Sequence, residues 1–218
     1  MVITMNKKYE LLTNDSIRYN NATLYRIKAL KDFTDVKKGD LGGYIEKEDN
    51  LSQDGNAWVA GNAKVFGNAK VSGDATVYGN AKVFGDATVY GSAMVCSNAR
   101  VFDNATVYDN AKVFGDVTVH GSAMICGNAC VYGNAWLYGD AKVYNNNADY
   151  VVIQGFASED GSNTTFFKCK DNTIKVKCGC FRGTIDEFEN KVKETHGDNK
   201  YAKEYLAIIT AMKIHFEI

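Results

Sequence analysis

The sequence predicts a mainly β protein in which short strands coil around a common axis. Residues 55–144 are fifteen consecutive hexapeptides of the general form G-[ND]-A-x-[VIL]-x, with no insertion. Four residue types, Ala, Asn, Gly and Val, supply 83 of the 218 positions. The chain has no proline, which suits interior strands that must donate every backbone N–H to the next coil.

Each hexapeptide is expected to form a four-residue strand and a two-residue corner. The third position is Ala in fourteen of the fifteen repeats, with Val117 the exception, and the fifth is always aliphatic. Successive side chains of a strand point to opposite faces, so these two positions share the inside. The first position is Gly except at Ser97, Asp103 and Asp109, and Gly and Asn tolerate the left-handed backbone of a tight corner.

The flanking segments are expected to cap the coil, because a stack of strands leaves unpaired edges at both ends. Residues 1–54 form the predicted N-terminal cap, with a strand at 24–30 and a Gly-rich entry at Gly39–Glu48. The coil domain is predicted over 55–156. Its register is broken at Asn145–Asn147 and its last strand lies at 150–153.

Residues 157–218 are predicted to form a small C-terminal ββαα domain after a loop at 157–163. The pair Asp171–Asn172 suits a two-residue turn in a hairpin over 164–178. That turn pairs residues that then share one apolar face: Cys169 with Ile174, Phe167 with Val176, and Thr165 with Cys178.

Two helices are expected to follow the hairpin. Thr184 and Glu187 fit a capping box for a helix that ends near His196, with Gly197 as its stop. A second helix begins near Tyr201 and carries one apolar stripe.

The repeat resembles the hexapeptide-repeat left-handed β-helix, in which three hexapeptides make one triangular coil of 18 residues. This resemblance implies a left-handed parallel β-helix of about five coils. The flanks, with GDLGGYIEKE before the repeats and CGCFRGTIDEF after them, look like a group of bacterial and phage or prophage β-helix proteins often labelled transferases. That group brings no established catalytic residues to this chain.

Enzymes of the resembled fold include acyltransferases, which add a catalytic histidine and a substrate-binding loop to the coil. No loop interrupts the fifteen repeats, and the histidine on the coil is His120, at an outward position where its neighbours are Phe or Tyr. A general base needs an orienting partner and a substrate pocket. His120 is therefore the candidate catalytic residue of an alternative function, a divergent acyltransferase.

A zinc site is the other chemistry considered, with four candidate ligands in the C-terminal domain: Cys169, Cys178, Cys180 and His196. Their spacing lacks the paired C-x₂-C of a zinc knuckle. The predicted hairpin also turns Cys169 and Cys178 into its apolar face, which favours packing over ligation. No metal or other cofactor is expected.

The outward positions carry the remaining pattern, because most residues after the aliphatic position are Phe or Tyr. Such rings can stabilise the coil by stacking on successive turns or can form an interface. One face interleaves cations with rings, as single-strand or nucleotide sites do. The predicted binding residues on this face are Lys64, Phe66, Lys82, Phe84, Arg100, Phe102, His120, Trp136 and Tyr138.

The sequence thus favours a non-catalytic binding protein, encoded by a phage or prophage, that oligomerises as a dimer or trimer. With 25 basic and 26 acidic residues, its charge suits neither a strongly basic nor a strongly acidic binder. The expected partner is a host protein complex, a nucleotide or a nucleic acid, as for an anti-CRISPR or a signal sponge. No export signal or membrane-spanning run is recognisable, so a bacterial cytoplasm without membrane association is expected.

Overall fold

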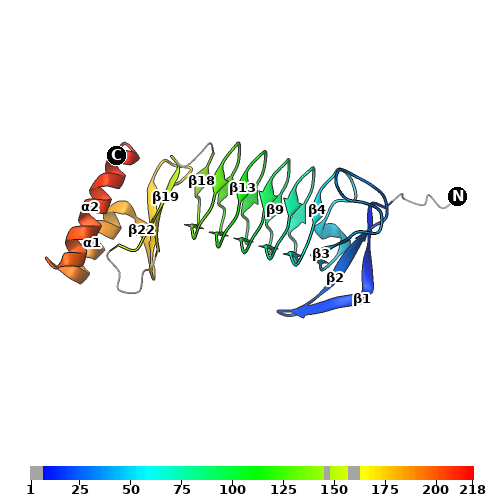
Figure 1. Cartoon of the computed structure of the whole chain (residues 1–218). Helices are drawn as coiled ribbons and strands as arrows, with labels where there is room; N and C mark the ends of the chain where they lie inside the picture. Colours follow the sequence, from blue (N-terminus) through cyan, green and yellow to red (C-terminus); the bar gives the residue numbers. More distant parts are fainter. Residues whose placement is uncertain (1–6, 145–147, 157–162) are drawn as a thin grey trace.

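The computed structural model describes residues 7–144, 148–156 and 163–218. The protein is an elongated parallel β-solenoid with an antiparallel hairpin at its N-terminal end and a sheet with two helices at its C-terminal end (Figure 1). The predicted register break at Asn145–Asn147 and most of the predicted loop at 157–163 lie outside the described residues.

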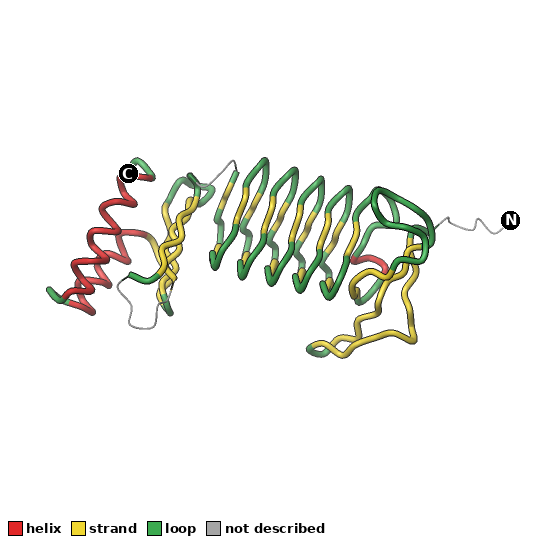
Figure 2. The backbone as a smooth tube through the Cα atoms, in the orientation of Figure 1, coloured by secondary structure: helices red, strands yellow, loops and turns green. Residues whose placement is uncertain are grey.

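Every hexapeptide contributes one strand, and the coils follow one another as evenly spaced turns (Figure 2). The fifteen strands are β4 (Trp58–Val59), β5 (Lys64–Val65), β6 (Lys70–Val71), β7 (Thr76–Val77), β8 (Lys82–Val83), β9 (Thr88–Val89), β10 (Met94–Val95), β11 (Arg100–Val101), β12 (Thr106–Val107), β13 (Lys112–Val113), β14 (Thr118–Val119), β15 (Met124–Ile125), β16 (Cys130–Val131), β17 (Trp136–Leu137) and β18 (Lys142–Val143).

These strands pair in parallel with the strand 18 residues later, as Val83 does with Val101, and so form three faces. Their orders are β5-β8-β11-β14-β17, β4-β7-β10-β13-β16 and β6-β9-β12-β15-β18. The repeat β-helix expected from the sequence is confirmed, while its left-handed sense stays a prediction.

Each strand spans two residues, so the expectation of four-residue strands was wrong. The reason lies in the corner, where in many repeats the N–H of the inward Ala bonds back to the carbonyl three residues earlier, as Ala99 N does to Cys96 O at 3.3 Å. That bond closes a turn that begins at the sixth position of one repeat and ends at the third position of the next.

The interior of the solenoid is a continuous column of inward Ala and aliphatic side chains, almost all fully buried. At the corners the first position has a positive φ, including the three departures from Gly: Ser97, Asp103 and Asp109, with φ of 61°, 57° and 58°. Two of them gain a bond to the next coil, because Asp103 Oδ2 accepts from Gly121 N at 3.2 Å and Asp109 Oδ2 from Gly127 N at 3.1 Å.

The solenoid has about six coils rather than five, because part of the predicted N-terminal cap forms another coil. Strand β3 (Leu41–Ile45) pairs in parallel with β5, and Leu51 bridges to Val71. The 3-10 helix η1 (Glu48–Asn50) lies between them. A Cβ at Gly43 would lie 2.7 Å from Ala63 O, so the Gly-rich entry permits this coil to approach the first repeat.

The N-terminal hairpin joins β1 (Tyr9–Tyr19) to β2 (Ala22–Ala29), which continues antiparallel into β3. Strand β2 confirms the strand expected at 24–30, whereas β1 was not predicted from the sequence. The tip of the hairpin bends back toward the coils (Figure 1). It brings Tyr19 edge-on to Phe66, with ring centroids 5.6 Å apart.

The C-terminal unit is a four-stranded antiparallel sheet followed by two helices. Its strands, in spatial order, are β19 (Tyr150–Gln154), β20 (Asn163–Lys168), β21 (Ile174–Cys178) and β22 (Phe181–Thr184). The predicted last strand of the coil is therefore β19, which pairs with β20. Strand β22 was not predicted.

The predicted hairpin register was wrong by one residue. Phe166 pairs with Val176, Thr165 with Lys177, and Lys168 with Ile174. The loop has three residues, 170–172, because Asn172 N bonds to Cys169 O at 3.0 Å and Asn172 takes a φ of +66°. A turn followed by a left-handed residue is the usual three-residue hairpin loop.

Both helices were predicted correctly. Helix α1 (Ile185–His196) has the Thr184–Glu187 capping box and ends at Gly197, and α2 (Lys200–His215) is N-capped by Asn199. They pack on the sheet face that carries Phe166, Ile174 and Val176. None of the helices within the described ranges is long and apolar enough to span a membrane.

Candidate binding face and seam cleft

The predicted binding residues lie on one face of the solenoid, here called the basic aromatic face. Phe66, Phe84 and Phe102 stack nearly parallel, with ring centroids 4.8–4.9 Å apart. His120 stacks on Phe102 at 4.9 Å, and Tyr138 follows at 6.1 Å. The rings thus form a continuous ladder, which stabilises neighbouring coils by cross-strand contact.

A row of cations runs beside this ladder, because Lys64, Lys82 and Arg100 are direct neighbours on successive strands. Burial and the charge of Lys82 lower the pKa of Lys64. Among the described residues these three cations form no ion pair with a carboxylate. Like charges on neighbouring strands repel each other, so an anion on this face would relieve the repulsion.

The basic aromatic face is bounded at both ends. At the N-terminal end the ring of Tyr19 lies 5.5 Å from Lys64 Nζ and 5.3 Å from Lys82 Nζ. At the C-terminal end the ladder meets the C-terminal sheet, where Tyr138 packs edge-on against Phe167 at 5.0 Å.

Two cations of the C-terminal sheet lie over the last rings of the face. Lys177 Nζ is 4.7 Å from the centroid of the Trp136 ring, and Arg182 Cζ is 5.4 Å from it. Lys177 and Arg182 face each other directly on β21 and β22. Burial and the charge of Arg182 lower the pKa of Lys177. We call Trp136, Lys177 and Arg182 the terminal cluster.

Both ring nitrogens of His120 are engaged. Trp136 Nε1 donates to His120 Nε2 at 2.9 Å, and His120 Nδ1 lies 3.5 Å from Asp103 Oδ2. Burial and then Arg182 lower the pKa of His120 against the opposing effect of Asp103. Asp103 is thus an orienting partner that the sequence did not reveal, but Nε2, the nitrogen that would take a proton from a substrate, already accepts a hydrogen bond.

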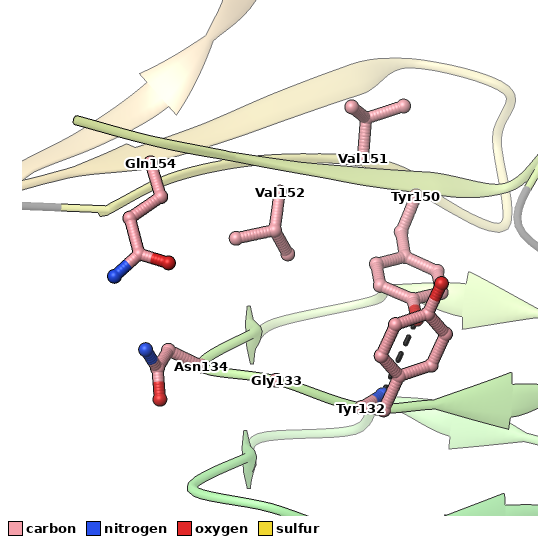
Figure 3. Close-up of a pocket in the computed structure, with 7 residues that line it drawn as sticks. All are labelled: Tyr132, Gly133, Asn134, Tyr150, Val151, Val152 and Gln154. Carbon is pink, nitrogen blue, oxygen red and sulfur yellow. Dashed lines mark hydrogen bonds between the residues drawn. The ribbon is translucent and has the colours of Figure 1, made fainter. Parts of the chain in front are cut away.

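A cleft in two compartments lies beside the terminal cluster, along the seam between the last coil and the C-terminal sheet. The larger compartment, about 330 Å³, is lined by Tyr132, Asn134, Tyr150, Val152 and Gln154, among others. In Figure 3 the side chains of Val152 and Gln154 point from the sheet toward the coil, and the amides of Gln154 and Asn134 lie on opposite sides of the gap.

The smaller compartment, about 200 Å³, shares Asn134 and is also lined by Trp136, Asn163, Thr165 and Lys177. Asn163 Oδ1 is buried there without a hydrogen-bond partner in the described part of the chain. We refer to the two compartments together as the seam cleft.

The candidate zinc ligands do not come together. Cys169 packs with the solenoid core, whereas Cys178 lies on the opposite sheet face beside Tyr205. The expectation that the two share a face was wrong because of the register shift. Cys180 is exposed and His196 ends α1. Within the described residues no three His, Cys, Asp or Glu side chains form a metal-binding group.

Sequence reasoning missed Tyr19, Lys177 and Arg182 as parts of this region. Lys177 lies in the predicted hairpin, but its contact with Trp136 of the last coil was not predicted. Arg182 lies on a strand without an alternating pattern, so its position depends on pairing with β21.

Comparison with known proteins supports the repeat architecture. Residues 123–139 match the family model of the YdcK beta solenoid repeat. No curated protein matches the chain.

Proposed function

We propose that this chain is a non-catalytic binding protein that holds a phosphate-bearing partner on its basic aromatic face. The observation that carries the proposal is the row of Lys64, Lys82 and Arg100, which has no carboxylate partner among the described residues, beside a continuous ladder of rings. Nucleotides and single strands are bound by this combination of cations and stacked rings.

The engagement of His120 favours binding over catalysis. Its Nε2 accepts from the Trp136 indole, and its lowered pKa makes it a weak proton acceptor. Its ring lies within the ladder, where it replaces a Phe of the preceding coils.

The resemblance to phage and prophage β-helix proteins supports a sharper version of the proposal. In that version the protein acts in a bacterial cytoplasm and sequesters a host macromolecule or nucleotide to antagonise host defence. Exposed tyrosines on the other two faces support assembly as a dimer or trimer, since large exposed rings commonly mark interfaces. These rings are Tyr78, Tyr90, Tyr132 and Tyr144.

A charge reversal on the face tests the proposal. The double variant Lys82→Glu, Arg100→Glu is expected to weaken binding of a short labelled single-stranded DNA by more than about tenfold, measured by fluorescence anisotropy. The matched control is Lys70→Glu, Lys112→Glu, which makes the same change at the same repeat position on the other two faces. Equal affinities for the two double variants would show that the basic aromatic face is structural.

The alternative function is a divergent acyltransferase, favoured by the Asp103–His120 pair. An assay of acyl-CoA turnover on the wild-type chain and His120→Ala separates the two functions. Binding without turnover is expected. A turnover in the wild type that is lost in His120→Ala would favour the enzyme.

A further inference from the structure

We infer that the seam cleft binds a single nucleotide, with its phosphate on Lys177 and Arg182 and its base in the larger compartment. This inference goes beyond the proposed binding on the basic aromatic face, because the seam cleft is a separate site. Asn134 lines both compartments, and the proposed nucleotide extends past this residue from one compartment to the other.

The phosphate end is indicated by charge. Lys177 and Arg182 are opposite each other across two strands, an arrangement that destabilises a sheet unless an anion lies between the charges. No carboxylate of the described residues forms an ion pair with either of them. Asp103, which lies near His120, is directed to that ring, and Glu187 is held by the backbone N–H of Thr184. Lys177 lines the smaller compartment, and Arg182 lies opposite Lys177 on the next strand. Two neighbouring cations suit a phosphate group.

The base end is indicated by the walls of the larger compartment. Tyr132 and Val152 give it apolar sides, and the side-chain amides of Asn134 and Gln154 face the gap (Figure 3). Neither amide has a hydrogen-bond partner in the described part of the chain. An amide donates and accepts at once, which matches the mixed edge of a nucleobase. The volume of about 330 Å³ is that of a small ligand pocket.

The wall of the smaller compartment also holds a buried acceptor. Asn163 Oδ1 has no hydrogen-bond partner in the described part of the chain, and an unsatisfied buried oxygen costs stability. The seam cleft thus offers a cation at the smaller compartment and the amide of Gln154 at the larger one, which suit the phosphate and the base of a nucleotide.

The test is calorimetric titration of the full chain with a panel of nucleoside monophosphates, the matching nucleosides and inorganic phosphate, each up to about 1 mM. At least one monophosphate is expected to bind more than about tenfold more tightly than its nucleoside and than phosphate. Phosphate binding as tightly as every nucleotide would overturn the assignment of the base, and no binding by any probe would overturn the site.

Variants then locate the ligand. Arg182→Gln is expected to weaken the nucleotide about tenfold while leaving the nucleoside unchanged, and Gln154→Leu is expected to weaken both. Lys175→Gln is the matched control, because Lys175 lies two residues from Lys177 on β21 but does not line the seam cleft. Circular dichroism and the melting temperature show whether each variant is folded.

The test of the seam cleft can fail or succeed independently of the test of the basic aromatic face. If Lys82→Glu, Arg100→Glu abolishes binding of single-stranded DNA while Arg182→Gln leaves nucleotide affinity unchanged, the basic aromatic face stands and the seam site is wrong. If Arg182→Gln weakens the nucleotide while the face variants change nothing, the seam site stands without the face.

Discussion

The two ends of the solenoid need opposite chemistry. Each coil donates its N–H groups to the carbonyls of the following coil, as Trp58 N does to Ala75 O at 3.0 Å. The first coils therefore expose carbonyl acceptors, and the last coil exposes N–H donors. Buried backbone groups need partners, so the N-terminal cap must donate and the C-terminal cap must accept.

The caps follow this rule through side chains. At the N-terminal end the buried Lys8 Nζ donates to Ala57 O at 2.9 Å, and Tyr9 OH donates to Leu51 O at 2.6 Å. Burial lowers the pKa of Lys8 to about 8. At the C-terminal end one side-chain oxygen serves each face. Thr165 Oγ1 accepts from Trp136 N, Tyr150 OH from Tyr132 N, and Asp149 Oδ2 from Tyr144 N.

The difference between the donating N-terminal cap and the accepting C-terminal cap also explains where a ligand can enter. The N-terminal cap closes its end with rings, since Trp58 packs edge-on against Phe33 at 5.4 Å and Tyr9 at 6.4 Å. At the C-terminal end Thr165 accepts one hydrogen bond from the last coil. Tyr150 OH accepts from Tyr132 N and donates to Cys130 O, and the seam cleft lies beside both residues. The C-terminal cap accepts the backbone N–H groups of the last coil through a few side-chain oxygens, and space for a ligand remains beside them. The packed rings of the N-terminal cap leave no such space among the described residues.

The largest expected effect comes from reversing the donor at the N-terminal end. Lys8→Glu places a carboxylate against carbonyl oxygens, and we expect it to cost more than about 4 kcal/mol in the free energy of unfolding, measured in urea. Lys7→Glu is the control, because Lys7 is exposed and its ion pair with Glu48 contributes at most about 1 kcal/mol. Similar losses for the two variants would mean that Lys8 does not cap the coil.

The corner glycines also differ between the two ends of the solenoid. A Cβ at Gly55, in the first repeat, would lie 2.6 Å from Gly73 O of the next coil, whereas at Gly133, in the last coil, it would meet nothing within 4 Å. Both residues have a positive φ, which costs an alanine about 1–2 kcal/mol. We expect Gly133→Ala to lose that amount and Gly55→Ala to lose about 1–3 kcal/mol more from crowding, measured by urea unfolding. Equal losses of unfolding free energy for the two variants would mean that contact with the following coil does not restrict the corner residue.

The solenoid could be predicted from the sequence because one period determines its pairing. Val83 lies beside Val101 for the same reason that Val101 lies beside Val119, and the cation row and ring ladder follow from that register. Helix α1 could be predicted equally well, since its capping box depends only on residues close together in the sequence. The C-terminal hairpin was predicted as well, but its register was not, because the left-handed conformation of Asn172 adds a residue to the loop and moves every partner by one.

Of the two candidate sites, one could be predicted from the sequence and the other could not. The basic aromatic face was named residue by residue, because outward positions on one face recur every 18 residues. The seam cleft was not, because it requires β19 to leave the coil and pair with β20, a contact with no repeating signal. The donor role of Lys8 was also hidden, since a lysine before a strand is ordinarily solvated.

A moderate effect is expected at the acceptor end. Thr165→Val keeps the shape of a buried side chain but removes the acceptor of Trp136 N, which should cost about 1–3 kcal/mol in the free energy of unfolding. Thr164→Val is the neighbouring control, because Thr164 faces the helices and bonds to Cys178 Sγ, a weak acceptor worth less than about 1 kcal/mol. If Thr164→Val costs more, the register described for β20 does not govern the cap.

The smallest effect tests the loop that sets this register. Asn172 has a φ of +66°, which glycine adopts without steric cost, so Asn172→Gly should change the unfolding free energy by no more than about 0.5 kcal/mol. Asn172→Val should cost about 1–2 kcal/mol, because a branched side chain opposes that conformation. If Gly and Val prove equally costly, the Asn172 side chain rather than its backbone holds the loop. In that case a contact of the Asn172 side chain, and not the backbone of the three-residue loop, would set the register that places Thr165 against Trp136 N.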